Sequence, residues 1–274
     1  MTTRASTDLP TYDHLKVDRP SDGVVLLTIS RPDRLNALTF GMFAELRQFC
    51  NDIAEDDTAR VVVLTGAGRA FCAGLDLDDA GTLPGMTTAE MVRGQESWSD
   101  AITAFRRIPQ PVVAAVNGAA AGAGFSLALA ADVRLASPAA RFNAAFVKIG
   151  LTGGDCGSSW ALPRVVGLGH ASEILMTGRM VDAEEAVRIG LVNRVVAPEE
   201  LLPAALELAA LIAGNSPLGV RLTKQVVLAN VDATSLRQAA ELENRGQVLT
   251  SRTEDMAEAL RAFREKRLPV YTGR

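Results

Sequence analysis

Apolar and polar residues alternate along the chain in blocks that predict strands separated by helices. The run at 23–29 predicts a mostly buried strand, which the turn-forming Arg31-Pro32-Asp33 closes. Thr39 can cap the next helix, which ends near 55–57 and has apolar residues at helical spacing: Met42, Phe43, Leu46, Phe49, Cys50 and Ile53. A β-branched strand follows at 60–66 and runs into glycine.

The alternation of strand, turn and helix continues towards the middle of the chain. The pattern predicts a polar, partly helical stretch at 87–107, a strand at 111–116 and a short helix at 125–131. Two further strands at 133–137 and 141–146 and a glycine-rich helix start at 150–157 follow. This order predicts an α/β fold in which helices cover stacked sheets. The tandem β-β-α order favours a spiral over one flat, doubly wound sheet.

The last quarter of the chain has a different pattern. From about Pro198 no strand is predicted, and the sequence is helical to near Arg267 with a break at Asn215-Ser216-Pro217. We therefore expect an α/β core over 1–197 and a helical segment over 198–274.

Composition narrows the classes of function. With 274 residues, 48% of them hydrophobic, the chain can bury one large core. A net charge of −4 and the lack of a Lys/Arg run argue against nucleic acid as a partner. Glycines interrupt the most apolar windows, so we expect no membrane span. The N-terminus lacks the apolar stretch of a secretory signal, and three widely spaced cysteines suggest no disulfide framework, so we expect a cytoplasmic protein.

Two glycine-containing turns, at 68–77 and 116–127, each follow an apolar strand. Small residues there let another backbone or a ligand approach closely. Free N–H groups at a helix start can stabilise negative charge on oxygen, by about 3–4 kcal/mol per donor in acyl-transfer enzymes. Such turns also serve plain packing or phosphate binding, so the pattern alone leaves all three uses open. No histidine accompanies the short acidic run after the first turn, and we expect no metal site there.

Together with Arg31-Pro32-Asp33-Arg34-Leu35-Asn36-Ala37-Leu38, the two turns resemble the three signature segments of the crotonase (enoyl-CoA hydratase/isomerase) superfamily in order and spacing. The resemblance continues through 175–179 and 186–195 to 263–267. It implies a crotonase-like β-β-α spiral with a C-terminal helical segment for assembly into homotrimers or pairs of trimers. It also implies an acyl-coenzyme A thioester as substrate, with no further cofactor.

The resemblance assigns roles to individual residues. The coenzyme A-binding positions, which act largely through main-chain groups, fall on Arg34, Leu35, Ala37, Ala73, Asp76 and Leu77. The two oxyanion-hole N–H donors fall on Leu75 and Ala123. Lys266 in the tail is a candidate for binding a phosphate of coenzyme A, either in its own subunit or in a neighbouring one. The alternative is that Lys266 lies in solvent at the end of a helix.

The chain departs from the family at the catalytic carboxylates. Hydratases of the superfamily have two glutamates, and the matching positions here are Ser126 and Phe146. A serine hydroxyl is a poor base near neutral pH, and phenylalanine has no exchangeable proton. Hydration by a pair of glutamates is therefore not expected.

Asp155 is the nearby acid in the sequence. Dienoyl-CoA isomerases and aromatic-acyl-CoA dehalogenases of the superfamily have a catalytic aspartate at a similar place, and matching it to Asp155 requires a one-residue insertion after Gly150. The alternative is that Asp155 caps the following helix. Three hypotheses follow: an enoyl-CoA hydratase or isomerase, an acyl-CoA-binding protein without turnover, and a hydrolase or dehalogenase with Asp155 as nucleophile.

Overall fold

The computed structural model describes residues 11–274, and the first ten residues of the polar N-terminal stretch lie outside the described part. Two sheets form the core. The larger has the order β1-β2-β3-β5-β7-β10 and the smaller β4-β6-β8-β9. In the larger sheet the strands are β1 (Leu15–Ser21), β2 (Val24–Ile29), β3 (Val61–Gly66), β5 (Val112–Val116), β7 (Val133–Ala136) and β10 (Arg194–Val195). In the smaller sheet they are β4 (Ala70–Cys72), β6 (Ala119–Ala121), β8 (Arg141–Asn143) and β9 (Val181–Asp182).

The chain alternates between the two sheets. Each of β3, β5 and β7 lies in the larger sheet, and the strand that follows it lies in the smaller one, with parallel pairing between successive turns. This alternation is the predicted β-β-α spiral, which is confirmed. The helices between the strands are α1 (Phe40–Ala54), α2 (Leu77–Ala80), α3 (Thr88–Arg107), α4 (Ala123–Ala130), α5 (Ser158–Val166), α6 (Leu168–Thr177) and α7 (Ala183–Arg188).

The inner strands β3 and β5 of the larger sheet are buried on both faces, which explains their nearly continuous Val-rich sequences. One face packs on α1, α3 and α4, and α1 begins as predicted, since the Thr39 hydroxyl accepts from Met42 N at 3.2 Å. The other face packs on α8 (Leu201–Ala213), whose small residues Ala205 and Ala209 are fully buried against the valines of β2, β3 and β5. The apolar residues of α8 are therefore largely used within the chain.

Three local predictions are corrected. The short helix begins at Ala123 rather than Phe125, so its first N–H groups lie directly after Gly122. The strand predicted over 141–146 ends at Asn143, and Phe146 lies in a 3-10 helix over Ala145–Ile149. The polar N-terminal stretch contains β1, an edge strand with only Leu15 fully buried, so no apolar run marked it.

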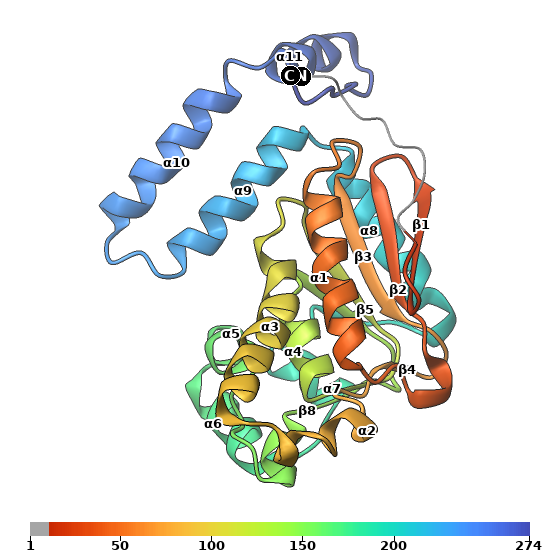
Figure 1. Cartoon of the computed structure of the whole chain (residues 1–274). Helices are drawn as coiled ribbons and strands as arrows, with labels where there is room; N and C mark the ends of the chain where they lie inside the picture. Colours follow the sequence, from red (N-terminus) through yellow and green to blue (C-terminus); the bar gives the residue numbers. More distant parts are fainter. Residues whose placement is uncertain (1–10) are drawn as a thin grey trace.

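Beyond α8 the chain leaves the core (Figure 1). The helices α9 (Pro217–Asn230) and α10 (Leu236–Thr250) form a hairpin that projects from the spiral, and α11 (Glu254–Glu265) follows. Buried Lys224 attaches α9 to the core: its Nζ lies 2.8 Å from Asp132 Oδ2 and donates to the Gln110 carbonyl at 2.9 Å. The predicted helical run and its break near residue 215 are both confirmed.

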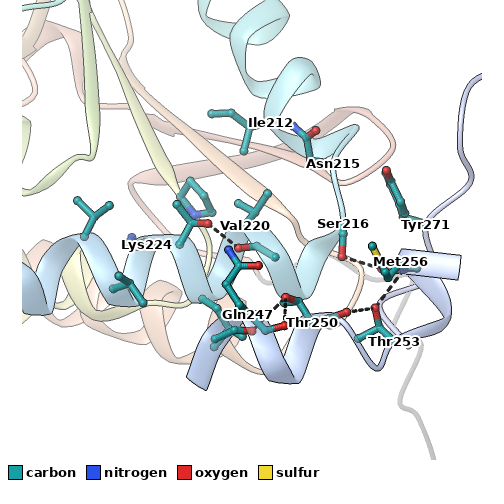
Figure 2. Close-up of a pocket in the computed structure, with 18 of the residues that line it drawn as sticks. Ile212, Asn215, Ser216, Val220, Lys224, Gln247, Thr250, Thr253, Met256 and Tyr271 are labelled. Carbon is teal, nitrogen blue, oxygen red and sulfur yellow. Dashed lines mark hydrogen bonds between the residues drawn. The ribbon is translucent and has the colours of Figure 1, made fainter. Parts of the chain in front are cut away.

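A groove of about 980 Å³ lies between α9, α10 and α11 (Figure 2). Its wall is mixed, with residues from all four C-terminal helices: Ile212, Val220, Lys224, Gln247, Thr250 and Met256. None of the candidate site residues lines it in the part of the chain that the structure covers.

Within residues 11–274, no single helix has the length and apolar character to cross a membrane. The segments 198–213 and 217–230 reach that length and composition only together, and they are bent by 105° at their break.

Candidate active site

The three signature segments meet at one place in the fold. Leu38 forms an isolated parallel bridge with Leu75: Leu38 N donates to Gly74 O at 2.7 Å, and Asp76 N donates to Leu38 O at 2.9 Å. The amide of buried Asn36 donates to Ala67 O at 2.8 Å and to Ala70 O at 2.7 Å. The Asn-Ala-Leu loop is thus bonded to both ends of the first glycine turn.

A buried ion pair joins the same two segments. Arg31 Nη1 lies 2.5 Å from Asp76 Oδ2, and the other Asp76 oxygen accepts from Asp78 N at 2.9 Å, which caps α2. The hydrogen bond from Arg31 holds the pKa of the Asp76 carboxyl below its usual range, and the Asp78 N–H adds to this against the effect of burial. Asp76 is therefore a structural link between the signature segments.

We expect Asp76→Asn to lower the free energy of unfolding by about 3 kcal/mol at pH 7, because it leaves Arg31 without its buried partner. A carboxyl with a depressed native pKa stabilises the fold above its unfolded pKa of about 3.9, and that contribution is lost as pH falls through the native pKa. The deficit should therefore shrink in acid. Urea unfolding at several pH values measures it.

Asp78→Asn is the matched control, because the Asp78 carboxylate is 76% exposed and lies 3.4 Å from Arg34. Its loss should cost about 0.5 kcal/mol or less. Equal effects of the two substitutions would contradict the linking role of Asp76.

The two predicted oxyanion donors have unused N–H groups. Among residues 11–274, neither Leu75 N nor Ala123 N donates to a protein acceptor. A Cβ built on Gly74, which has φ +95°, would lie 2.7 Å from Ala121 O and 3.5 Å from Ala123 N, so the two turns touch at this glycine. Ala123 is also the first residue of α4, where the helix dipole favours negative charge. The two unused N–H groups therefore belong to two turns that touch each other.

The predicted coenzyme A residues are grouped around this point, but most of their N–H groups are occupied. Leu35, Ala37, Ala73 and Asp76 all donate within the signature segments. The carbonyls of Leu35, Ala37 and Asp76 also accept hydrogen bonds within the chain, so a further main-chain contact at these three residues would use a second lone pair of the carbonyl oxygen. Arg34 and Leu77 are exposed beside them, and Leu77 is 81% exposed although it is apolar.

Ser126 and Phe146 lie beside the hole, in the positions where the resemblance predicts carboxylates. Ser126 is buried one helical turn after Ala123, and its Oγ donates to the carbonyl of Asp155 at 3.0 Å. Its hydroxyl is thus committed to the backbone. Buried Phe146 has its ring 3.5 Å from a Cβ built on Gly122, the residue before α4. The second carboxylate position is apolar.

The structure contradicts the capping hypothesis for Asp155. Helix α5 begins at Ser158 with Gly157 as its N-cap, at φ +83° and without a side-chain cap hydrogen bond. Partly buried Asp155 instead accepts at Oδ1 from Gln95 Nε2 and from Cys156 N. Its backbone carbonyl accepts from the hydroxyl of Ser126, which lies three residues after Ala123 on α4.

Lys266 is not near this site within the same chain. It ends α11 in the left-handed conformation, with φ +53°, and is exposed. Figure 1 shows α11 at the opposite end of the molecule from α2 and β4. Any contact of Lys266 with coenzyme A would require a neighbouring subunit.

Comparison with known proteins decides the family. A family model described as "Enoyl-CoA hydratase/isomerase" matches residues 19–274. The chain belongs to the enoyl-CoA hydratase/isomerase family. Its relatives include "Probable enoyl-CoA hydratase echA12" of Mycobacterium bovis, 43% identical over 93% of this chain and 92% of the relative. The 1,2-epoxyphenylacetyl-CoA isomerase of Escherichia coli is 38% identical over 92% and 96%.

Solved structures agree with this assignment. An enoyl-CoA hydratase from Bacillus anthracis superposes with a TM-score of 0.91 at 34% identity, over 96% of this chain and all of that one. The predicted fold class and the predicted enzyme class, lyase or isomerase of the enoyl-CoA hydratase/isomerase family, are therefore confirmed.

Two residues of this enoyl-CoA hydratase/isomerase site were not predicted as contributors. Arg31 was recognised only as a turn residue, and its pairing with Asp76 has no local signal because 45 residues separate them. Gln95 is one polar residue in a polar stretch, 60 residues from Asp155. Only the fold brings these pairs together.

Proposed function

We propose that this enzyme is an enoyl-CoA isomerase that shifts a carbon–carbon double bond in an acyl-CoA thioester, with Asp155 as its single acid/base. The observation that carries the proposal is the arrangement around α4: two N–H groups without an acceptor among residues 11–274, the Asp155 loop bonded to Ser126, and Ser126 and Phe146 at the two positions where hydratases of the superfamily have glutamates. A coenzyme A thioester is the substrate, and no resident cofactor is required.

In the proposed reaction the two N–H groups stabilise negative charge on the thioester oxygen, and Asp155 first removes a proton and then returns it. The thioester oxygen accepts hydrogen bonds from the N–H groups of Leu75 and Ala123. Asp155 takes a proton from C2 of a 3-enoyl thioester, and the electron pair moves onto the oxygen to form an enolate, which the two donors stabilise. The Asp155 carboxylic acid then returns the proton at C4. The double bond moves to C2–C3, and the carboxylate is regenerated.

Hydration fits the site less well. Adding water requires one group that activates the water and one that protonates C2, and the side chains beside the hole at these positions are a hydroxyl bonded to the Asp155 carbonyl and a phenyl ring. The relatives' names include both a hydratase and an isomerase, so the family alone does not select the reaction. Binding without turnover and nucleophilic attack by Asp155 remain the alternatives.

Paired assays test the proposal. With 3-hexenoyl-CoA we expect accumulation of 2-hexenoyl-CoA, and with crotonyl-CoA we expect water addition at least 100-fold slower. Chromatography with mass detection separates the products, because hydration adds the mass of water and isomerisation adds none. Crotonyl-CoA hydration at the faster rate would overturn the proposal, and no turnover of either thioester would favour the binding protein.

We also propose that α9–α11 mediate assembly into homotrimers or pairs of trimers. Because α8 packs on its own sheet, the apolar surface must come from the later helices, where large apolar side chains are exposed: Val231, Leu236, Val248, Leu249, Phe263, Leu268 and Val270. In such an assembly Lys266 can approach a neighbour's coenzyme A. Three free, buried cysteines are compatible with a reducing cytoplasm as the location.

Multi-angle light scattering at micromolar concentration should therefore give the mass of three or six chains. We expect Leu236→Glu with Phe263→Glu to give a monomer, because both side chains are 84% exposed and charges there cannot be buried against another chain. Lys16→Glu, on the exposed edge strand β1, is the control and should leave the mass unchanged. A monomeric parent protein would contradict the assembly proposal.

A further inference from the structure

The two carboxylate oxygens of Asp155 have different surroundings. Oδ1 accepts from Gln95 Nε2 at 2.5 Å and from Cys156 N at 2.7 Å. Oδ2 accepts from no protein donor among residues 11–274. One oxygen is thus fixed by two donors, and the other is available.

The backbone of Asp155 is held separately from its side chain. Its carbonyl accepts from Ser126 Oγ at 3.0 Å and from Ser158 N at 2.9 Å, and its own N–H donates to Ser158 Oγ at 3.1 Å. These contacts come from α4 and α5, whereas Gln95 approaches from α3. The contact from Gln95 can therefore be removed without releasing the loop.

We propose that Gln95 is a positioning residue for the reaction: its amide fixes Oδ1 of Asp155 and leaves Oδ2 as the oxygen that exchanges the substrate proton. The inference rests on the proposed acid/base role of Asp155. With the Cys156 N–H as the second donor to Oδ1, the Gln95 amide fixes the orientation of the carboxylate.

The other titratable groups near Asp155 do not replace the Gln95 amide as a nitrogen donor. Burial, the charge of Asp155 and a hydrogen bond to its side chain raise the pKa of the adjacent Cys156 thiol, so the thiol is protonated at neutral pH and is at most a weak donor. Helix α4 has no ionisable side chain, and α5 has none before Arg164, which lies over the Trp160 ring. On the 3-10 helix over Ala145–Ile149, Lys148 is exposed, as are Arg93 and Glu96 on either side of Gln95 on α3. The amide of Gln95 is the side-chain nitrogen donor to the carboxylate.

The experiment compares kcat and KM for 3-hexenoyl-CoA isomerisation in the full-length protein. Gln95→Met keeps the length of the side chain but removes the donor, and Gln95→Glu places a second carboxyl against Oδ1. We expect kcat to fall about tenfold in Gln95→Met and further in Gln95→Glu, with little change in KM, because misplacing a reacting group slows the chemical step more than it weakens binding.

Glu96→Gln is the matched control, one residue away and exposed, and its kcat and KM should match those of the parent. Thermal unfolding identifies any variant that does not fold. One Gln95 variant is apolar and the other charged, so if one fails to fold the other still tests the proposal. Parental kcat in folded Gln95 variants, with Asp155→Asn inactive, would overturn the role of Gln95 alone. An active Asp155→Asn would overturn the proposed function and this inference together.

Discussion

Asp155→Asn should lower kcat for the double-bond shift by about 10³-fold, within the range of 10²–10⁴ that general acid–base groups contribute. The amide cannot take the C2 proton, so the enolate cannot form. The fold should be retained, because the asparagine carbonyl can still accept from Gln95 Nε2 and from Cys156 N, and the backbone contacts of Ser126 and Ser158 are unchanged. Steady-state rates with 3-hexenoyl-CoA measure the effect.

Binding and stability distinguish lost chemistry from lost structure. Asp155→Asn should bind the thioester with nearly parental affinity and unfold within a few degrees of the parent, since it removes no packing. A rate within tenfold of the parent in a folded variant would show that Asp155 is not the acid/base.

Ala123→Pro should reduce kcat by about 10²–10³-fold, because it deletes one oxyanion-hole donor. A main-chain donor cannot be removed by changing an ordinary side chain, but proline lacks the N–H. Ala123 is the first residue of α4, a position where helices tolerate proline since that N–H has no partner within the helix. The substitution therefore removes the donor at the one place in the helix where the fold permits it.

Ala123→Gly is the control, because glycine keeps the N–H and only removes a methyl group. Its rate should remain within a few-fold of the parent, and both variants should show the parental far-UV circular dichroism. If Ala123→Pro and Ala123→Gly turned over the substrate equally fast, the N–H of Ala123 would not act on the thioester oxygen.

The sequence predicted the spiral because its long strands are buried on both faces and appear as Val-rich runs, as in β3 and β5. In the smaller sheet β8 was predicted, whereas β4, β6 and β9 were missed. β4 and β6 are three residues long and lie within the glycine turns, so no periodic pattern marks them. The edge strand β1 was missed because most of its residues face solvent.

The site was predicted only as far as local motifs define it. The resemblance assigned the N–H donors to Leu75 and Ala123, and neither N–H has a protein acceptor among residues 11–274. The capping hypothesis for Asp155 was wrong because Gly157 adopts a left-handed conformation and starts α5 two residues later. The resemblance assigned assembly to the whole C-terminal helical segment, because a sequence does not show whether an apolar helix such as α8 packs on its own sheet or on another chain.

The central claim is that Asp155 forms a thioester enolate at the hole made by Leu75 and Ala123. Exchange of the C2 protons of phenylacetyl-CoA in deuterated water tests it directly, because the aryl group makes these protons more acidic and the acyl group has no chain double bond to move or hydrate. Nuclear magnetic resonance should show exchange with the parent protein and only background exchange with Asp155→Asn and Ala123→Pro. Parental exchange by folded Asp155→Asn would contradict the account.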